Sequence, residues 1–234
     1  MKTEAFIGLY NRSDIMAKPW AENGYECHLF DLEAGSTQHD NIHFHSGDIF
    51  NNLNMIRWIM STRRVKFMAA FPPCTDLSVS GAKHFDTKAK QDAFFWAKAM
   101  QHVYLSYHVG ELIGCPYQIE NPKSMVATLW RSADYTFNPC DYGGYLPADH
   151  INSAYPDIYP SMDAYMKETW LWTGGGFKMP TKLKVQPVEK DFPGFSKLGG
   201  KSERTKKIRA LTPEGFARAI FEANGNCKPE NVVI

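Results

Sequence analysis

A cysteine in a stiff, polar loop is the first residue of this sequence that could do chemistry. Cys74 follows the apolar run 66–71 through two prolines, Pro72 and Pro73, and precedes a polar stretch that includes Ser78. Prolines hold a backbone extended, and a lysine and a histidine further along the loop favour the thiolate form of a nearby cysteine. A lone cysteine beside apolar sequence is more often a small buried residue, but the polar loop favours a nucleophile here.

A carboxylic acid occupies the equivalent place after a second apolar run. Glu120 and Asn121 end the run that begins at Pro116, and Pro122 follows them. A fixed loop could hold the pKa of Glu120 high enough for proton transfer; the alternative is a surface residue at the end of a strand. Ligands bind at the carboxyl ends of strands in open α/β sheets. The two loops together therefore predict an enzyme.

The elements that must position these loops alternate between strand and helix, which predicts an α/β fold with a mostly parallel sheet and helices on both faces. Residues 138–166 break the pattern with a stretch rich in Pro, Gly, Asp and Tyr. A final helix at 213–223 should have Thr212 as its cap and Pro213 in its first position. We expect strands at 3–10, 25–31, 42–45, 66–71, 116–120 and 169–173, a turn at 174–176, and helices at 13–23, 51–63, 88–112 and 122–130.

Composition narrows the class of protein. The 234 residues are 44% hydrophobic, enough to bury one large core, so we expect a single domain over 1–234 with an irregular insertion at 138–205. Five cysteines without a CxxC pair argue against a disulfide framework and against a zinc finger.

No apolar run is long enough to cross a bilayer, and a signal peptide is not evident, so we expect a soluble, cytoplasmic protein with no membrane partner. The basic run 197–209 is either a solvated face or a contact for phosphates.

The two loops resemble motifs of the DNA cytosine-5 methyltransferases. Pro72-Pro73-Cys74 with Ser78 is similar to their cysteine loop, and Glu120-Asn121 is similar to their Glu-Asn loop. Three further segments follow in the family's order: Asp31-Leu32-Glu33, Gly47-Asp48-Ile49 and 209–217. The resemblance covers most of 5–130 and 205–223, and it is to a small, phage-like member with little or no target-recognition domain.

The sequence departs from the family at three places. The first loop, 8–14, lacks the glycine-rich cofactor turn, and we expect Asn11 to supply a left-handed turn there. Proline follows Glu120-Asn121 where the family has valine. The family's Gln-x-Arg-x-Arg motif is not evident, and Lys167-Glu168-Thr169 is its nearest candidate.

The resemblance implies a Rossmann-like methyltransferase fold that uses S-adenosylmethionine to methylate carbon 5 of cytosine in DNA, either in a duplex with the base flipped out or in a single strand. It implies that Cys74 is the nucleophile and that Glu120 acts on ring nitrogen 3. The donor-binding residues that it implies are Gly8, Tyr10, Asn11, Asp31, Glu33, Asp48, Phe71 and Pro72. The substrate contacts that it implies are Pro73, Ser78, Lys83, Asn121, Lys167 and Thr169.

Three other interpretations stay open. The same chemistry could act on a free cytidine nucleotide or on single-stranded nucleic acid, because little sequence is left for target recognition. A metal-binding protein would use His39, His43 and His45 with Asp40 and Asp48, since alternate residues of a strand share one face. A non-catalytic relative that binds DNA or a partner would account for the altered first loop.

Overall fold

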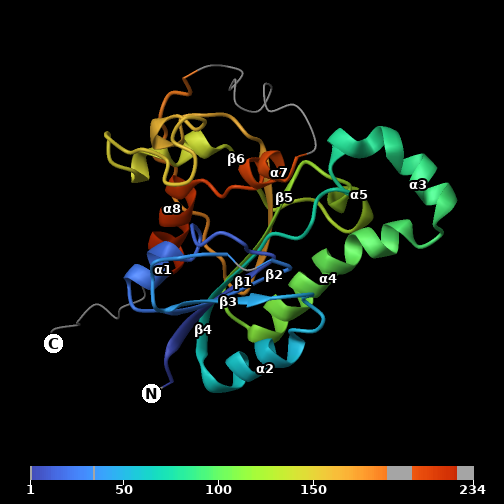
Figure 1. Cartoon of the computed structure of the whole chain (residues 1–234), viewed down its shortest axis with the longest axis horizontal. Helices are drawn as coiled ribbons and strands as arrows, with labels where there is room; N and C mark the ends of the chain where they lie inside the picture. Colours follow the sequence, from blue (N-terminus) through green and yellow to red (C-terminus); the bar gives the residue numbers. More distant parts are fainter. Residues whose placement is uncertain (1, 34, 189–201, 226–234) are drawn as a thin grey trace. The chain divides into compact units, whose positions relative to one another are not determined.

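The computed structural model describes residues 2–33, 35–188 and 202–225 (Figure 1). They fall into two compact units: the first contains the described residues within 1–136 and 168–177, and the second contains those within 137–167 and 178–234. The irregular stretch predicted at 138–166 lies in the second unit. The expectation of one domain with an insertion at 138–205 stays a prediction. None of the helices in the described ranges is long and apolar enough to cross a membrane.

A seven-stranded sheet forms the centre of the first unit, with strand order β3-β2-β1-β4-β5-β7-β6. Strands β1 to β5 are parallel to their neighbours, whereas β7 runs antiparallel to β5. The strand order reverses between β1 and β4, as in doubly wound folds, and the antiparallel β7 is inserted between β5 and β6. The predicted fold class, a Rossmann-like α/β fold with a mostly parallel sheet, is confirmed. The strands are β1 (Glu4–Leu9), β2 (Glu26–Asp31), β3 (Ile42–Ser46), β4 (Arg64–Ala70), β5 (Tyr117–Pro122), β6 (Tyr135–Phe137) and β7 (Thr169–Gly174).

Helices cover both faces of this sheet, because neighbouring residues of a strand point to opposite sides. On one face Phe6 of β1 and Phe67 of β4 lie against Trp20 of α1, with ring centroids 5.5 and 5.1 Å from it. On the other face Ile7 and Met68 belong to a buried cluster with residues of α2 and α4 (Figure 1). The helices of this unit are α1 (Lys18–Glu22), α2 (Leu53–Thr62), α3 (Phe85–Gln91), α4 (Phe95–Ile113) and α5 (Val126–Leu129).

Three helices of this unit begin or break where the sequence did not predict it. Helix α1 begins at Lys18 rather than 13, and a proline in its first turn suits this start because no N–H is needed there. The helix predicted over 88–112 is interrupted, because Asp92 is extended and its Oδ1 accepts the N–H of Phe94 at 2.9 Å. The helix expected from Pro122 is only α5, since Pro122 ends β5.

The described residues of the second unit form short 3₁₀ turns and two helices. Helix α7 (Glu203–Arg209) occupies part of the basic run, and α8 (Glu214–Asn224) is the predicted C-terminal helix. Its N-cap is Pro213 rather than Thr212, and the prediction of Thr212 is wrong. A residue distant in sequence takes the place of the predicted cap. Oδ2 of the buried Asp163 accepts the N–H of Gly215 at 2.8 Å, and so it bonds a backbone N–H group in the first turn of α8.

Candidate functional site

The cysteine loop and the Glu-Asn loop lie side by side, because β4 and β5 are neighbours. Ala70 pairs with Ile119 in the parallel register, so the cysteine loop leaves the carboxyl edge of the sheet beside Glu120 and Asn121. The Glu-Asn segment is not the loop that the sequence predicts: it forms the end of β5, where Glu120 and Asn121 pair with Leu171 and Trp170 of β7. The side-chain amide of Asn121 donates a hydrogen bond of 3.0 Å to the carbonyl oxygen of Pro72, and both residues are buried. This bond joins the loop of the candidate nucleophile to the end of β5, which carries the candidate acid.

The main chain extends the same junction over several residues. Loop 77–79 and segment 123–125 exchange backbone hydrogen bonds, which explains why no helix begins at Pro122. The contacts are Val79 N–H to Lys123 O at 3.2 Å, Met125 N–H to Leu77 O at 2.8 Å, and an antiparallel bridge between Ser78 and Ser124.

Cys74 sits at a tight turn with a half-buried side chain. Its carbonyl oxygen accepts the N–H groups of Leu77 and Ser78 at 3.0 and 2.8 Å. An ion pair of 2.5 Å between Asp76 and Lys88 anchors the same turn to α3. The turn is therefore held at both ends, while the cysteine keeps access to solvent.

Glu120 is half-buried near the end of β5, on the face opposite to that of Asn121. Gln118 shares its face and is fully buried, and neither polar atom of its amide has a hydrogen-bond partner among the described residues. Thr169 lies beside Pro122, because β7 begins where β5 ends. No pattern in the sequence singled out Gln118, since a glutamine within an apolar run has no motif of its own.

The other predicted substrate contacts are less concentrated. Pro73 and Lys83 are exposed, and Lys83 belongs to the 3₁₀ segment that follows the cysteine loop. Lys167 belongs to the second unit, where its Nζ donates to the carbonyl of Arg209 at 2.9 Å. Thr169 belongs to the first unit, so the nearest candidate for the arginine motif is divided between the two units.

The predicted donor-binding residues gather at the carboxyl edge of β1 to β4. Backbone hydrogen bonds connect the strand ends: Asn11 N–H to Phe30 O, Gly47 N–H to Asp31 O, and Phe71 N–H to Leu9 O, at 2.9–3.0 Å. Gly8 is needed there for packing, because a methyl group on it would lie 2.6 Å from Oδ1 of Asn11. The left-handed residue of the first loop is Tyr10, with φ 54°, so the expectation for Asn11 is wrong.

The two acids at the end of β2, Asp31 in the strand and Glu33 after it, differ in their surroundings. Burial raises the pKa of Asp31 above its ordinary value, against hydrogen bonds from the backbone of Glu33 and Leu32 that lower it. Glu33 is more exposed and forms an ion pair of 2.5 Å with Arg12. Asp31 therefore remains the better placed acceptor for hydroxyl groups of a ligand.

A histidine from α4 completes the polar group near Asp48. The hydroxyl of Tyr10 lies 3.1 Å from Nδ1 of His102, and the ring of Phe50 lies 5.7 Å from the same imidazole. Burial and the charge of Asp48 raise the pKa of Tyr10, whereas burial lowers the pKa of His102. Sequence analysis missed His102, because one histidine in an amphipathic helix carries no signal of a site.

Histidines of β3, the outermost strand, and of its neighbour β2 form a separate cluster. Nδ1 of the buried His28 lies 3.1 Å from Nε2 of His45, and its ring centroid lies 5.3 Å from that of His43. Nε2 of His28 lies 3.0 Å from a carboxylate oxygen of Glu26. Within the described ranges no three His, Cys, Asp or Glu side chains are arranged to hold a metal ion. The metal-site interpretation of His39, His43 and His45 therefore finds no support. The histidine at the centre of this cluster is His28, which contacts both His43 and His45.

We expect His28 to make the stability of the protein depend on pH. Burial lowers its pKa from 6.5 to about 4, against the opposing charge of Glu26. Between these values the unfolded chain binds a proton that the folded chain does not, so stability is full above pH 6.5 and falls as the pH falls towards 4. The loss should be about 2–3 kcal/mol. Urea unfolding at pH 7 and at pH 4.5 measures this loss of unfolding free energy. His28→Gln should reduce the loss, whereas the control His108→Gln, at an exposed position, should leave it unchanged. A loss in His28→Gln as large as in the wild type would contradict the assignment to His28.

We expect Asn121→Ala to uncouple the two loops. The carbonyl of Pro72 would lose its donor while buried, which costs about 1–3 kcal/mol. If the loops act together, turnover should fall roughly 10- to 100-fold with little change in donor affinity. Thermal unfolding measures the loss of stability, calorimetry the affinity for the donor, and a turnover assay the loss of activity. Ser124→Ala is the matched control at the same junction, because its buried hydroxyl has no partner among the described residues; equal effects of the two substitutions would remove the special role of Asn121.

Comparisons with known proteins give a distant structural match. No protein-family model matches the sequence, and no curated protein is found to be similar. The crystal structure of a candidate DNA modification methyltransferase, encoded within a prophage of E. coli, superposes with a TM-score of 0.41 and 9% identity. The match covers 74% of this chain and 46% of that one, so this chain spans less than half of the other protein's length. The fold assignment rests on the strand order rather than on this match.

Proposed function

We propose that this protein transfers a methyl group from S-adenosylmethionine to carbon 5 of cytosine in DNA, through a covalent bond to Cys74. The observation that supports it most is the buried hydrogen bond from Asn121 to the carbonyl of Pro72. It couples a partly exposed cysteine to a half-buried glutamate at the carboxyl edge of a parallel sheet, where such folds bind their ligands.

In this proposal Cys74 is the nucleophile and Glu120 the acid. The thiolate forms a bond to carbon 6 of cytosine, and the electron pair of the 5,6 double bond moves into the ring. Glu120 is protonated and donates a hydrogen bond to ring nitrogen 3, which stabilises the developing negative charge. Carbon 5 thereby becomes nucleophilic.

Two acceptors among the proposed donor-binding residues, Asp31 and Asn11, support S-adenosylmethionine as the donor. When bound, this molecule supplies an electrophilic methyl group to carbon 5. Asp31 would accept hydrogen bonds from the ribose hydroxyls, with Glu33 held back by its ion pair with Arg12. Oδ1 of Asn11 is buried without a partner among the described residues, and so it offers an acceptor to the ammonium group. The remaining residues proposed to line this site are Gly8, Tyr10, Asp48, Phe71 and Pro72.

Release of the product restores the cysteine. Carbon 5 loses its proton to water, the bond between sulfur and carbon 6 breaks, and the double bond returns, so that Cys74 leaves as a thiolate. A cytosine within a duplex is out of reach of a thiol in a loop, so the base must be flipped out or single-stranded. Pro73, Ser78, Lys83, Lys167 and Thr169 are the proposed contacts to this substrate.

One observation favours a second candidate, a non-catalytic relative. The ion pair between Arg12 and Glu33 occupies one of the acids expected to bind the donor, in a loop that lacks the glycine-rich turn. Calorimetry with S-adenosylmethionine separates the two candidates. If the protein binds S-adenosylmethionine and Asp31→Asn weakens this binding, the result supports the enzyme. If the folded protein does not bind S-adenosylmethionine, the result supports the non-catalytic relative.

Transfer of labelled methyl groups tests the proposed reaction and its acceptor. Duplex DNA, single-stranded DNA and free cytidine nucleotides are incubated in parallel with labelled donor. We expect label in DNA at carbon 5 of cytosine. Label in the free nucleotide alone would change the substrate class, and label on another atom would contradict the proposed chemistry.

A further inference from the structure

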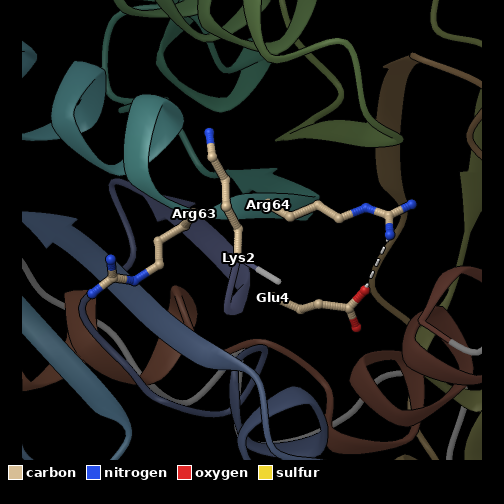
Figure 2. A pocket seen from close by; sticks show the side chains of 4 residues that line it. All are labelled: Lys2, Glu4, Arg63 and Arg64. Carbon is tan, nitrogen blue, oxygen red and sulfur yellow. Dashed lines mark ion pairs between the residues drawn. The ribbon is translucent and has the colours of Figure 1, made fainter.

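A basic hollow lies at the amino ends of β1 and β4, at the opposite edge of the sheet from Cys74. Lys2, Glu4, Arg63 and Arg64 line it (Figure 2). The six residues of β1 span about 20 Å at a rise of about 3.3 Å each. The hollow is therefore separate from the candidate catalytic loops.

The hollow carries three cationic side chains and one carboxylate. Glu4 lies 3.8 Å from Arg64 and 3.6 Å from Lys66, a distance at which exposed ion pairs hold side chains only weakly. Figure 2 shows that the side chains of Lys2, Arg63 and Arg64 extend in different directions. Diverging cations do not close around one small anion, but they suit a chain of anions.

An exposed tryptophan lies beside these cations. Trp58 of α2 has 47% of its surface exposed, and the guanidinium of Arg63 lies 5.1 Å from its ring centroid. Two hydrogen bonds to Glu26, of 2.7 and 3.1 Å, fix that guanidinium. Lys2 donates to the carbonyl of Ser61 in the last turn of the same helix. The indole and the guanidinium of Arg63 are thus held together, and the ammonium of Lys2 is held at the end of the same helix.

We infer that Lys2, Trp58, Arg63 and Arg64, together the Trp58 platform, bind single-stranded nucleic acid. The phosphates lie against the cations, and an unpaired base stacks on the exposed indole. Aromatic side chains within a basic surface are the means by which proteins bind single strands without reading their sequence. The platform holds the polymer at a distance from the chemistry, so it governs affinity and its dependence on salt, and it does not rest on the proposed reaction.

Binding of a fluorescent, mixed-sequence oligonucleotide of about 20 nucleotides tests the platform, measured by anisotropy without donor. Trp58→Ala should weaken binding about 5-fold or more, since stacking of one base supplies that much. Lys2→Glu with Arg64→Glu should weaken it about 10-fold or more and reduce the slope of log K against log salt by about 1.4, since each phosphate contact to a single strand contributes about 0.7. Heparin is a polyanion without bases. The affinity of the protein for heparin should therefore fall with the charge reversals and stay unchanged in Trp58→Ala.

Matched variants elsewhere on the surface complete the test. Phe94→Ala removes an aromatic side chain that is 69% exposed, and Lys90→Glu with Lys178→Glu reverses two exposed charges; both should bind like the wild type. Wild-type affinity in Trp58→Ala would overturn the inference. An equal loss in the Lys90 and Lys178 variant would also overturn it, because net charge alone would then explain the effect. Melting temperatures establish that each variant is folded.

Discussion

Cys74→Ala should abolish methyl transfer while leaving the affinity for S-adenosylmethionine nearly unchanged. Without the sulfur no bond forms to carbon 6, and carbon 5 of cytosine is a poor nucleophile, so we expect turnover to fall by about 10⁴-fold or more. The side chain is half-buried in a turn held by its own main chain and by the ion pair of Asp76 with Lys88. Its truncation should therefore disturb the fold little, and calorimetry with the donor should read close to the wild type.

The control for this substitution is a second cysteine of the same unit. Cys115 is buried, and desolvation raises the pKa of its thiol to about 12, so it is not a nucleophile at neutral pH. Cys115→Ala should keep most of the activity. Appreciable turnover by Cys74→Ala would remove the covalent mechanism, and a loss as large in Cys115→Ala would indicate damage to the fold instead.

Glu120→Gln should lower the rate of transfer by about 10²- to 10⁴-fold, because a neutral amide donates a weaker hydrogen bond to ring nitrogen 3 and cannot deliver a proton. The change conserves size, so packing beside Leu171 of β7 should survive. Single-turnover kinetics measure the chemical step apart from product release, and we expect the loss to appear there rather than in donor affinity.

Glu22→Gln is a matched control, since it makes the same change at an exposed position of α1. It should leave the rate unaltered. If Glu120→Gln were as fast as this control, Glu120 would have no part in the reaction, and the half-buried carboxylate would need a structural explanation.

The sheet and the grouping of loops could be predicted from the sequence, because short apolar runs separated by turn residues define buried strands. β1, β2, β3, β4 and β5 were all expected to within a few residues. Since the carboxyl ends of parallel strands share one edge, the proximity of the loops after β4 and β5 followed from the strand assignments alone.

The starts and interruptions of helices could not be predicted from hydrophobic spacing, because single polar side chains decide them. Oδ1 of Asp92 accepts the N–H of Phe94, two residues further on, and divides a predicted helix, although the apolar spacing continues. Asp163 caps α8 from a segment far along the chain, which no local pattern contains. The same limit applies to His28 and His102, whose partners are brought near only by the sheet and by α4.

The most direct test of the central claim is the covalent bond itself. DNA containing 5-fluorocytosine, incubated with the protein and S-adenosylmethionine, should remain attached to it, because the fluorine on carbon 5 cannot leave as a proton does. We expect mass spectrometry to find the methylated base on the peptide that contains Cys74, and to find no adduct with Cys74→Ala. Methyl transfer to ordinary DNA without any trapped complex, or an adduct on another residue, would contradict the account.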